Sequence, residues 1–241
     1  MIKIKKHLED FKTIVGVISN ITITDVNLTF NEDGITVRVV DGTNANLLLL
    51  KLKKEMFDVY EIDKPNTYTI NSLMLNKVVR HIAKDGKELE LEIKNEGFVM
   101  KNSKNNFLLS YYVGLEDVRP MPQISITSKW NIDMTEFLNI IEGFKEFGEI
   151  FKVVGKDKLV LHVKGASIEG ETITESKLIN GEEDESWYGI SYFVNILDMK
   201  SILKNVELGF STGGPCELDY SNDWIDFKWI LAGRVDENED K

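Results

Sequence analysis

The chain has 241 residues, of which 42% are hydrophobic and 29% charged, a composition typical of a globular protein. It has no run of about 18 apolar residues, so no membrane-spanning helix is predicted. The net charge is −11, with 17 basic and 17 acidic residues in positions 1–120 and 12 against 23 in the remainder. This balance excludes nucleic-acid binding through the overall field and leaves only a local basic surface for that purpose.

The first 52 residues predict a helix followed by three strands. Alternating apolar residues on both sides of the turn Asn31–Gly34 predict an antiparallel hairpin over Val26–Val39, and the run Leu47–Leu50 predicts a third strand. The helix is indicated by apolar residues at positions i, i+3, i+4 and i+7, which are Phe11, Ile14, Val15 and Ile18.

A second helix is predicted within Tyr68–Ile82, with Asn71 or Ser72 as its cap. Its polar side carries Lys77, Arg80 and Lys84, either as an ordinary solvated face or as a basic contact surface. Three strands are expected after it, over Glu88–Ile93, Gly97–Lys101 and Phe107–Val113.

The pattern then repeats after a proline-bearing segment. Phe137 repeats the first helix at a shift of 126 residues, and Leu159 and Phe227 repeat later strands at shifts of 124 and 120. A fourth helix is expected at about Phe193–Lys204. We therefore predict an α+β protein of two similar domains, each with two helices packed on antiparallel sheets. The predicted boundaries are 1–114, 115–127 for a connecting loop, and 128–241.

The sequence contains no phosphate loop, GxGxxG, HExxH or CxxC motif. The run Thr212–Pro215 predicts a tight turn, and Glu182–Glu185 predicts a solvated loop. A hydrolase that uses acidic loop residues would need a positioned base or nucleophile, for which the sequence gives no sign. We predict a protein without catalytic residues, metal or cofactor. The single cysteine, Cys216, excludes an intrachain disulfide and favours a reducing compartment, for which we predict the cytoplasm.

These features together resemble the sliding clamps of the proliferating cell nuclear antigen (PCNA) family, in their archaeal form. The similarity lies in the segment Asp33–Asn44 with its following leucine strand, in the helix Leu73–Ile82, in the helix from Tyr192 onward, and in the terminal strand Trp229–Val235. The resemblance implies a ring-forming protein in which three subunits encircle duplex DNA, with the helices lining the hole. It places loose, sequence-independent DNA contacts at Lys12, Lys77, Arg80, Lys84, Lys200 and Lys204. The third helix departs from this pattern because it carries Glu142, Glu146 and Glu149.

The resemblance also implies a pocket for a short partner peptide with a glutamine, an aliphatic residue and two aromatic residues. It implies DNA polymerase, clamp loader, flap endonuclease and DNA ligase as partners, and a role as a polymerase processivity factor. At Gly233 the family usually has proline. The pocket residues that it implies are Val40, Asn44, Met121, Pro122, Leu231, Ala232 and Gly233.

Subunits are expected to join edge to edge, with the strand Phe107–Val113 of one subunit pairing with about Glu171–Ile179 of the next. The sequence leaves three arrangements open: a homotrimer, one subunit of a heterotrimer, or a clamp-fold interaction module that does not encircle DNA. The interface residues that the resemblance implies are Phe107, Leu109, Tyr111, Ile173 and Lys177.

Overall fold

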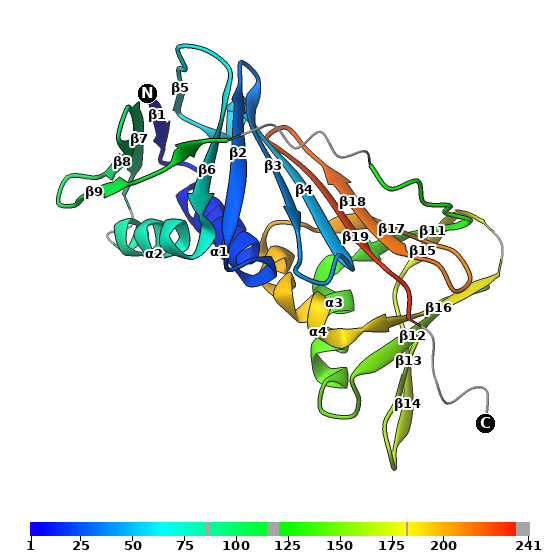
Figure 1. Cartoon of the computed structure of the whole chain (residues 1–241). Helices are drawn as coiled ribbons and strands as arrows, with labels where there is room; N and C mark the ends of the chain where they lie inside the picture. Colours follow the sequence, from blue (N-terminus) through cyan, green and yellow to red (C-terminus); the bar gives the residue numbers. More distant parts are fainter. Residues whose placement is uncertain (85–86, 115–120, 182, 235–241) are drawn as a thin grey trace. The chain divides into compact units, whose positions relative to one another are not determined.

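The computed structural model, shown in Figure 1, describes residues 1–84, 87–114, 121–181 and 183–234. The chain forms two compact units. The first contains Met1–Pro120 and Ser221–Phe227, and the second contains Met121–Tyr220 and Lys228–Lys241. Of the predicted connecting loop, residues 121–127 contain neither helix nor strand, and 115–120 lie outside the described residues. The predicted domain boundaries remain a proposal.

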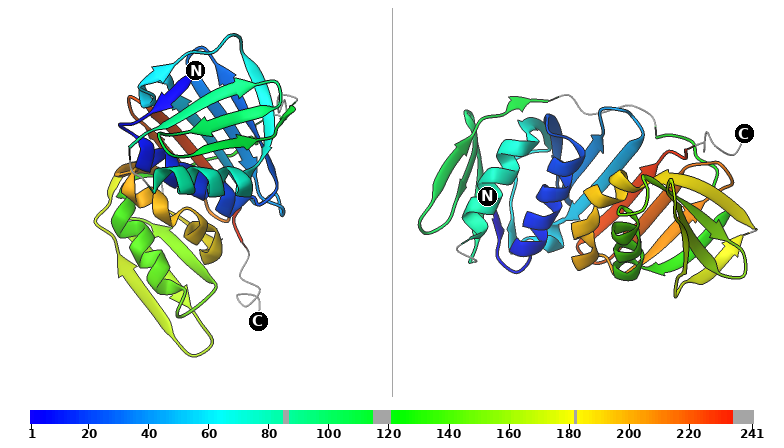
Figure 2. Two further views of the ribbon diagram at one scale, coloured as in Figure 1. Left: turned by 90° about the vertical axis from the view of Figure 1, so that its left-hand side faces the viewer. Right: turned by 90° about the horizontal axis from the view of Figure 1, so that it is seen from below.

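The first unit is built from two antiparallel sheets and two helices. The strand orders are β5-β1-β7-β8-β9 and β10-β6-β2-β3-β4. Figure 2 shows the two helices side by side, and they pack directly on each other. The elements are β1 (Ile2–Ile4), α1 (Leu8–Ile21), β2 (Asp25–Asn31), β3 (Gly34–Val40), β4 (Asn46–Lys53), the 3₁₀ helix η1 (Lys54–Met56), β5 (Val59–Tyr60), β6 (Asn66–Asn71), α2 (Ser72–Ala83), β7 (Leu89–Lys94), β8 (Gly97–Lys101), β9 (Asn106–Leu109) and β10 (Tyr112–Val113).

The predicted first helix and hairpin are both present. All four apolar residues of the predicted helix face are at most 6% exposed in α1. In the hairpin, Asn31 pairs with Gly34, and Gly34 has a φ of 139° with Leu52 O only 2.0 Å from the place that a Cβ would occupy. Only glycine fits this turn. The first unit also contains a cluster of aromatic rings in contact with one another, formed by Phe30, Tyr68, Phe98 and Tyr111.

The second unit repeats this plan, with strand orders β14-β13-β12-β16 and β18-β17-β11-β15. Phe193 contacts the rings of Phe137, Phe151, Tyr188 and Trp229 in its core. The elements are β11 (Ser128–Asp133), α3 (Met134–Phe144), β12 (Ile150–Gly155), β13 (Leu159–Lys164), β14 (Glu169–Ile173), β15 (Lys177–Gly181), β16 (Asp184–Gly189), α4 (Ile190–Asn195), the 3₁₀ helix η2 (Leu197–Ser201), β17 (Asn205–Phe210), β18 (Cys216–Ser221) and β19 (Ile225–Leu231), whose first residues belong to the first unit. The predicted α+β class is confirmed.

One predicted strand of the first unit and the predicted fourth helix differ from the structure. The second helix begins after Asn71, one of its two predicted caps, whose side chain accepts a bond from Met74 N at 3.0 Å, and residues 66–71 before it form the strand β6, which pairs with β2. The predicted strand Phe107–Val113 is two strands, because β9 pairs with β8 whereas β10 pairs with β6.

The fourth helix is shorter than predicted and starts earlier. Ile196 leaves the helical conformation, with φ −105° and ψ 9°, so α4 ends at Asn195 and continues as η2. Lys204 therefore lies beyond the helix. The predicted solvated loop at Glu182–Glu185 is confirmed at Glu183, which is exposed, but is wrong from Asp184 on, because Asp184 is only 7% exposed and begins strand β16; Glu182 lies outside the described residues. The turn at Thr212–Pro215 is present, and Gly213 has a φ of 63°.

Candidate functional site

The exposed side of α2 carries three cations in different states. Lys77 and Lys84 are exposed, and within the described part of the chain neither ammonium group has an ion-pair or hydrogen-bond partner. Arg80 is held in place: its Nε donates to Asn76 Oδ1 at 3.0 Å, and Asn76 Nδ2 donates to the buried Ser19 Oγ of α1 at 3.0 Å. The α2 face thus combines one oriented guanidinium with two exposed ammonium groups that lack a partner among the described residues.

The Arg80 guanidinium also lies close to Gly16 of α1. An ideal Cβ at Gly16 would lie 3.4 Å from a terminal guanidinium nitrogen of Arg80. The predicted DNA-contact residue Lys12, also on α1, is half-buried and forms an ion pair with Glu9 three residues earlier. Lys12 therefore carries less unpaired charge than the cations of α2.

The second unit is less basic at the corresponding positions. Lys200 Nζ donates to Asn139 Oδ1 at 2.8 Å and lies 3.5 Å from the Glu142 carboxylate of α3. Lys204 is exposed beyond η2, and its backbone oxygen accepts a bond from Met134 N at 2.8 Å. The acidic third helix thus neutralises one of the two predicted cations.

In the first unit, Val40 and Asn44 line the same hollow of about 300 Å³. The loop between them is closed by Asp41, whose carboxylate accepts bonds from Thr43 N at 3.2 Å and Asn46 N at 2.8 Å. Asn44 has a φ of 58°, a left-handed conformation that asparagine tolerates well. The structure therefore brings Val40 and Asn44 together on a preformed loop.

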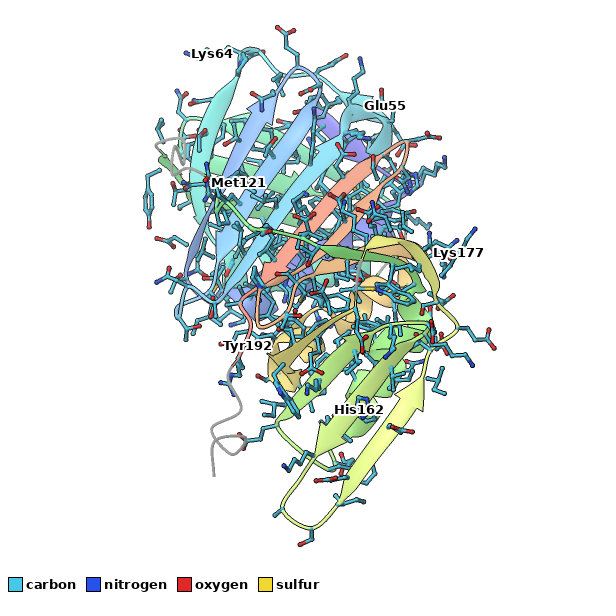
Figure 3. All side chains as sticks on the ribbon, turned by 90° about the vertical axis from the view of Figure 1, so that its right-hand side faces the viewer. Glu55, Lys64, Met121, His162, Lys177 and Tyr192 are labelled. Atoms are coloured by element: carbon cyan, nitrogen blue, oxygen red, sulfur yellow. The ribbon has the colours of Figure 1, made fainter. Side chains whose placement is uncertain are left out.

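In the second unit, Met121, Pro122 and Ala232 are exposed, whereas Leu231 is 1% exposed and faces the core. Figure 3 shows the irregular segment that begins at Met121. The departure from the family's proline at Gly233 has a steric basis. A Cβ at Gly233 would lie 2.5 Å from Gly214 O, so the β17–β18 turn occupies the space of any larger residue.

The predicted interface strands lie at sheet ends, but several of the named side chains face inward. Leu109 is 9% exposed, Tyr111 contacts Phe98, and Phe107 contacts the His81 ring. The outward residues at this edge are Leu108 and Tyr112, which are 58% and 62% exposed. Strand alternation would have identified them, since residues that flank inward-facing positions point outward.

The other predicted edge also consists of two strands. β14, which contains Ile173, ends the sheet β14-β13-β12-β16, and β15, which contains Lys177, ends the other sheet of the second unit. Three apolar residues of these strands are exposed: Ile173 at 54%, Leu178 at 40% and Ile179 at 48%. Among the described residues, both units thus present strand edges without a neighbouring strand, which are surfaces suited to pairing with another strand.

No cluster of three or more metal-binding side chains occurs within 1–84, 87–114, 121–181 and 183–234. In the same ranges no helix is long and apolar enough to cross a membrane. The largest lowering of a carboxyl pKa is at Glu92, where hydrogen bonds from Lys101 and then Lys94 lower the pKa to about 2. These ion pairs are formed by side chains of the neighbouring strands β7 and β8.

The fold and these surfaces define a clamp-type α+β protein of two similar units. Residues 4–118 match the family described as "Proliferating cell nuclear antigen, N-terminal domain". The chain is 26% identical over 245 residues to a DNA polymerase sliding clamp of Thermococcus gammatolerans, with 95% of this chain and 96% of the relative covered. A sliding clamp of Thermococcus kodakarensis is 27% identical with the same coverage. The chain is therefore similar to the sliding clamps of the PCNA family over nearly its whole length.

Solved structures agree with this fold. A PCNA2–PCNA3 complex from Sulfolobus tokodaii matches with a TM-score of 0.84 and 19% identity, covering 98% of this chain and 99% of that one. A. fulgidus PCNA, solved with the C-terminal region of FEN-1 bound, matches with a TM-score of 0.83 and 20% identity, covering 99% and 100%. At these identities the structural matches support the fold alone.

Proposed function

We propose that this protein is a DNA sliding clamp that encircles duplex DNA as a trimeric ring and acts as a cytoplasmic polymerase processivity factor without enzymatic activity. The observation that carries the proposal is the pairing of features in one chain: a clamp fold with an open strand edge in each unit, and an exposed basic face on a helix of an otherwise acidic protein. A ring that holds DNA by topology needs only weak phosphate contacts, because strong contacts would slow its movement.

A protein-recognition role completes the proposal. The loop at Val40–Asn44 in the first unit and the exposed residues Met121, Pro122 and Ala232 in the second are the residues that we expect to contact short peptides of a polymerase, a clamp loader, a flap endonuclease and a ligase. One relative's structure contains a bound FEN-1 segment, which supports this assignment by analogy.

The decisive experiment is the mass in solution by light scattering. A homotrimer should have three times the chain mass of 27.6 kDa. Leu108→Lys places a charge on the exposed edge strand β9 and should shift the protein towards monomer. The matched control is Ile23→Lys, which adds the same charge at a loop residue that is 70% exposed.

A monomer at all concentrations would contradict a self-sufficient ring and favour the second candidate, one subunit of a heterotrimer. The pairing of Lys200 with Glu142 favours this candidate, because it makes the second unit a weaker DNA-contact surface than the first. Mixing the chain with other clamp subunits of its source and measuring the mass again would then detect the mixed ring.

A further inference from the structure

The segment 121–127 has no helix or strand, yet its C-terminal end is fixed to the second unit. Thr127 N donates to Phe210 O at 3.2 Å, and Thr127 Oγ1 donates to Asp184 Oδ2 at 2.7 Å. Ile126 lies over Gly209 of β17, where a Cβ would come within 2.7 Å of its Cγ2. The C-terminal end of the segment is therefore anchored by two hydrogen bonds and by a glycine that leaves room for the Ile126 side chain.

Asp184 is the centre of this anchor. Asp184 is only 7% exposed. Its other carboxylate oxygen, Oδ1, accepts bonds from Thr212 N at 3.0 Å and Thr212 Oγ1 at 2.8 Å. Three donors thus hold one buried carboxylate between the segment and the β17–β18 turn. Burying a charged group is costly unless it is fully hydrogen-bonded, so removing one donor should loosen the whole contact.

We infer that Asp184, Thr127 and Gly209 are positioning residues for the partner-peptide pocket, because they fix the C-terminal end of the segment that carries Met121 and Pro122. None of the three needs to touch the peptide. The inference rests on the proposed peptide-binding function. It adds a cause for the shape of the pocket: an irregular segment presents a reproducible surface only if one end is immobilised, which reduces the ordering cost of binding.

Gly209→Ala tests the steric part of the anchor. The backbone φ of Gly209 lies outside the left-handed range, so alanine adds bulk against Ile126 without backbone strain. The probe is a fluorescein-labelled peptide with a glutamine, an aliphatic residue and two aromatic residues, and its affinity is measured by fluorescence polarisation. We expect binding at least about threefold weaker, and hydrogen–deuterium exchange over residues 121–127 faster than in the wild type.

The double variant Gly209→Ala/Ile126→Ala removes the collision and should recover both the peptide affinity and the slow exchange towards the Ile126→Ala level. Such recovery distinguishes displacement of the segment from general destabilisation of β17, which a smaller residue at 126 would not repair. Absence of recovery would overturn the steric part of the inference.

Thr127→Val tests the hydrogen-bonded part, because valine keeps the shape and removes the donor to Asp184. Thr36→Val is the matched control, at a half-exposed strand threonine of the first unit. We expect faster exchange over 121–127 and weaker peptide binding in the first variant only. If the wild type binds no such peptide, the proposed pocket is wrong, and the exchange data still test the anchor. If the wild type binds and Thr127→Val matches it in both measurements, the positioning role is wrong.

Discussion

At the scale of single residues, short-range sterics decide details that residue type alone leaves open. Gly233 occupies the family's proline position because Gly214 O fills the space beside it, and Gly209 is glycine because Ile126 covers it. Each of these contacts joins residues that are distant in sequence. The sequence shows where the glycines are, and the fold shows which neighbouring atoms leave no room for a larger residue there.

The first prediction concerns Gly233→Pro. The family residue should be unfavourable here, because its ring carbons would collide with Gly214 O and force the β17–β18 turn to move. We expect a loss of about 1–3 kcal/mol in the free energy of unfolding, as for other overpacked sites. Urea denaturation measures it, with Gly42→Pro as the control, since a Cβ at Gly42 would meet no atom within 4 Å. Equal stability of the wild type and Gly233→Pro would contradict this steric explanation.

At the scale of elements, α2 carries three exposed cations of the first unit on one helix. Its apolar side is buried through Leu75, Val79 and Ile82, and this packing fixes which residues face outward. Asn71 determines where the helix begins, and Lys84 lies at its C-terminus, where a cation is favoured by the helix dipole. The periodicity of 3.6 residues predicted which residues of α2 face outward. The hydrogen bonds that link Arg80 through Asn76 to Ser19 of α1 depend on how the two helices pack, which the periodicity does not show.

The second prediction concerns the double variant Lys77→Glu/Lys84→Glu. Because both ammonium groups lack partners among the described residues, reversal should remove DNA contacts without breaking an ion pair there. If each contacts one phosphate, the slope of log K against log salt should fall by about 1.8. Fluorescence anisotropy with duplex DNA at several salt concentrations gives this slope.

Lys54→Glu/Lys64→Glu is the matched control, with the same change in net charge. Both residues are exposed and lie outside α1 and α2; Figure 3 shows Lys64 in its loop. Equal losses in the two double variants would show that net charge matters and the α2 face does not, which would favour the interaction module that does not encircle DNA.

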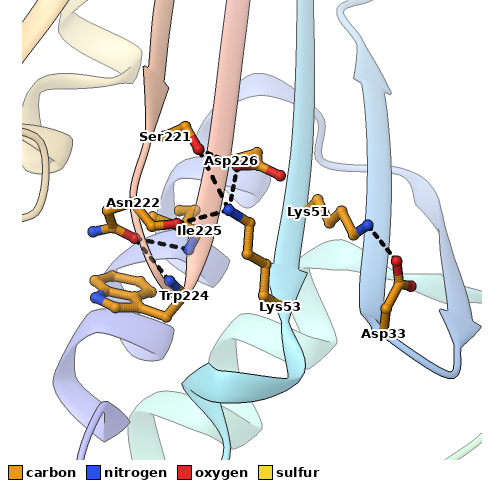
Figure 4. Close-up of polar contacts among 8 residues, drawn as sticks. All are labelled: Asp33, Lys51, Lys53, Ser221, Asn222, Trp224, Ile225 and Asp226. Carbon is orange, nitrogen blue, oxygen red and sulfur yellow. Dashed lines mark hydrogen bonds and ion pairs between the residues drawn. The ribbon is translucent and has the colours of Figure 1, made fainter.

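At the scale of the whole chain, distant segments are joined inside the first unit. Lys53 Nζ lies 2.7 Å from the Asp226 carboxylate and 2.7 Å from Asn222 O, as Figure 4 shows, and Lys53 N donates to Trp224 O at 3.0 Å. Trp224 also stacks on His7, with ring centroids 4.7 Å apart. Residues 221–227 are therefore part of the N-terminal unit although they come late in the sequence.

The third prediction uses the charge of this contact. Burial raises the pKa of Asp226, but hydrogen bonds from Lys53 and Ser221 outweigh it and hold the pKa below its ordinary value. A carboxyl group with a lowered pKa stabilises the folded state above its unfolded pKa of about 3.9, and this contribution is lost as the pH falls through the folded pKa. Lys53→Met should therefore be less stable than the wild type at pH 7, and the difference should shrink below about pH 4.

Urea denaturation at pH 7, 5 and 3 measures this difference. Lys64→Met is the control, because Lys64 is exposed and lacks a partner among the described residues. A stability difference between Lys53→Met and the wild type that stays constant over this pH range would show that Lys53 acts through packing, and that its charge contributes nothing.

The sequence by itself determined the local pattern: the α1 and α2 faces, the hairpin at Gly34, the turn at Gly213 and the duplication of the whole plan. These depend on periodicity and turn chemistry, which act over a few residues. The tertiary structure decided what depends on distant partners. It divided Phe107–Val113 between two sheets, turned Leu109 inward and Leu108 outward, paired Lys200 with Glu142, and buried Asp184 under Thr127. Strand pairing and ion pairing join residues far apart in sequence, and no local pattern records which partner each residue meets.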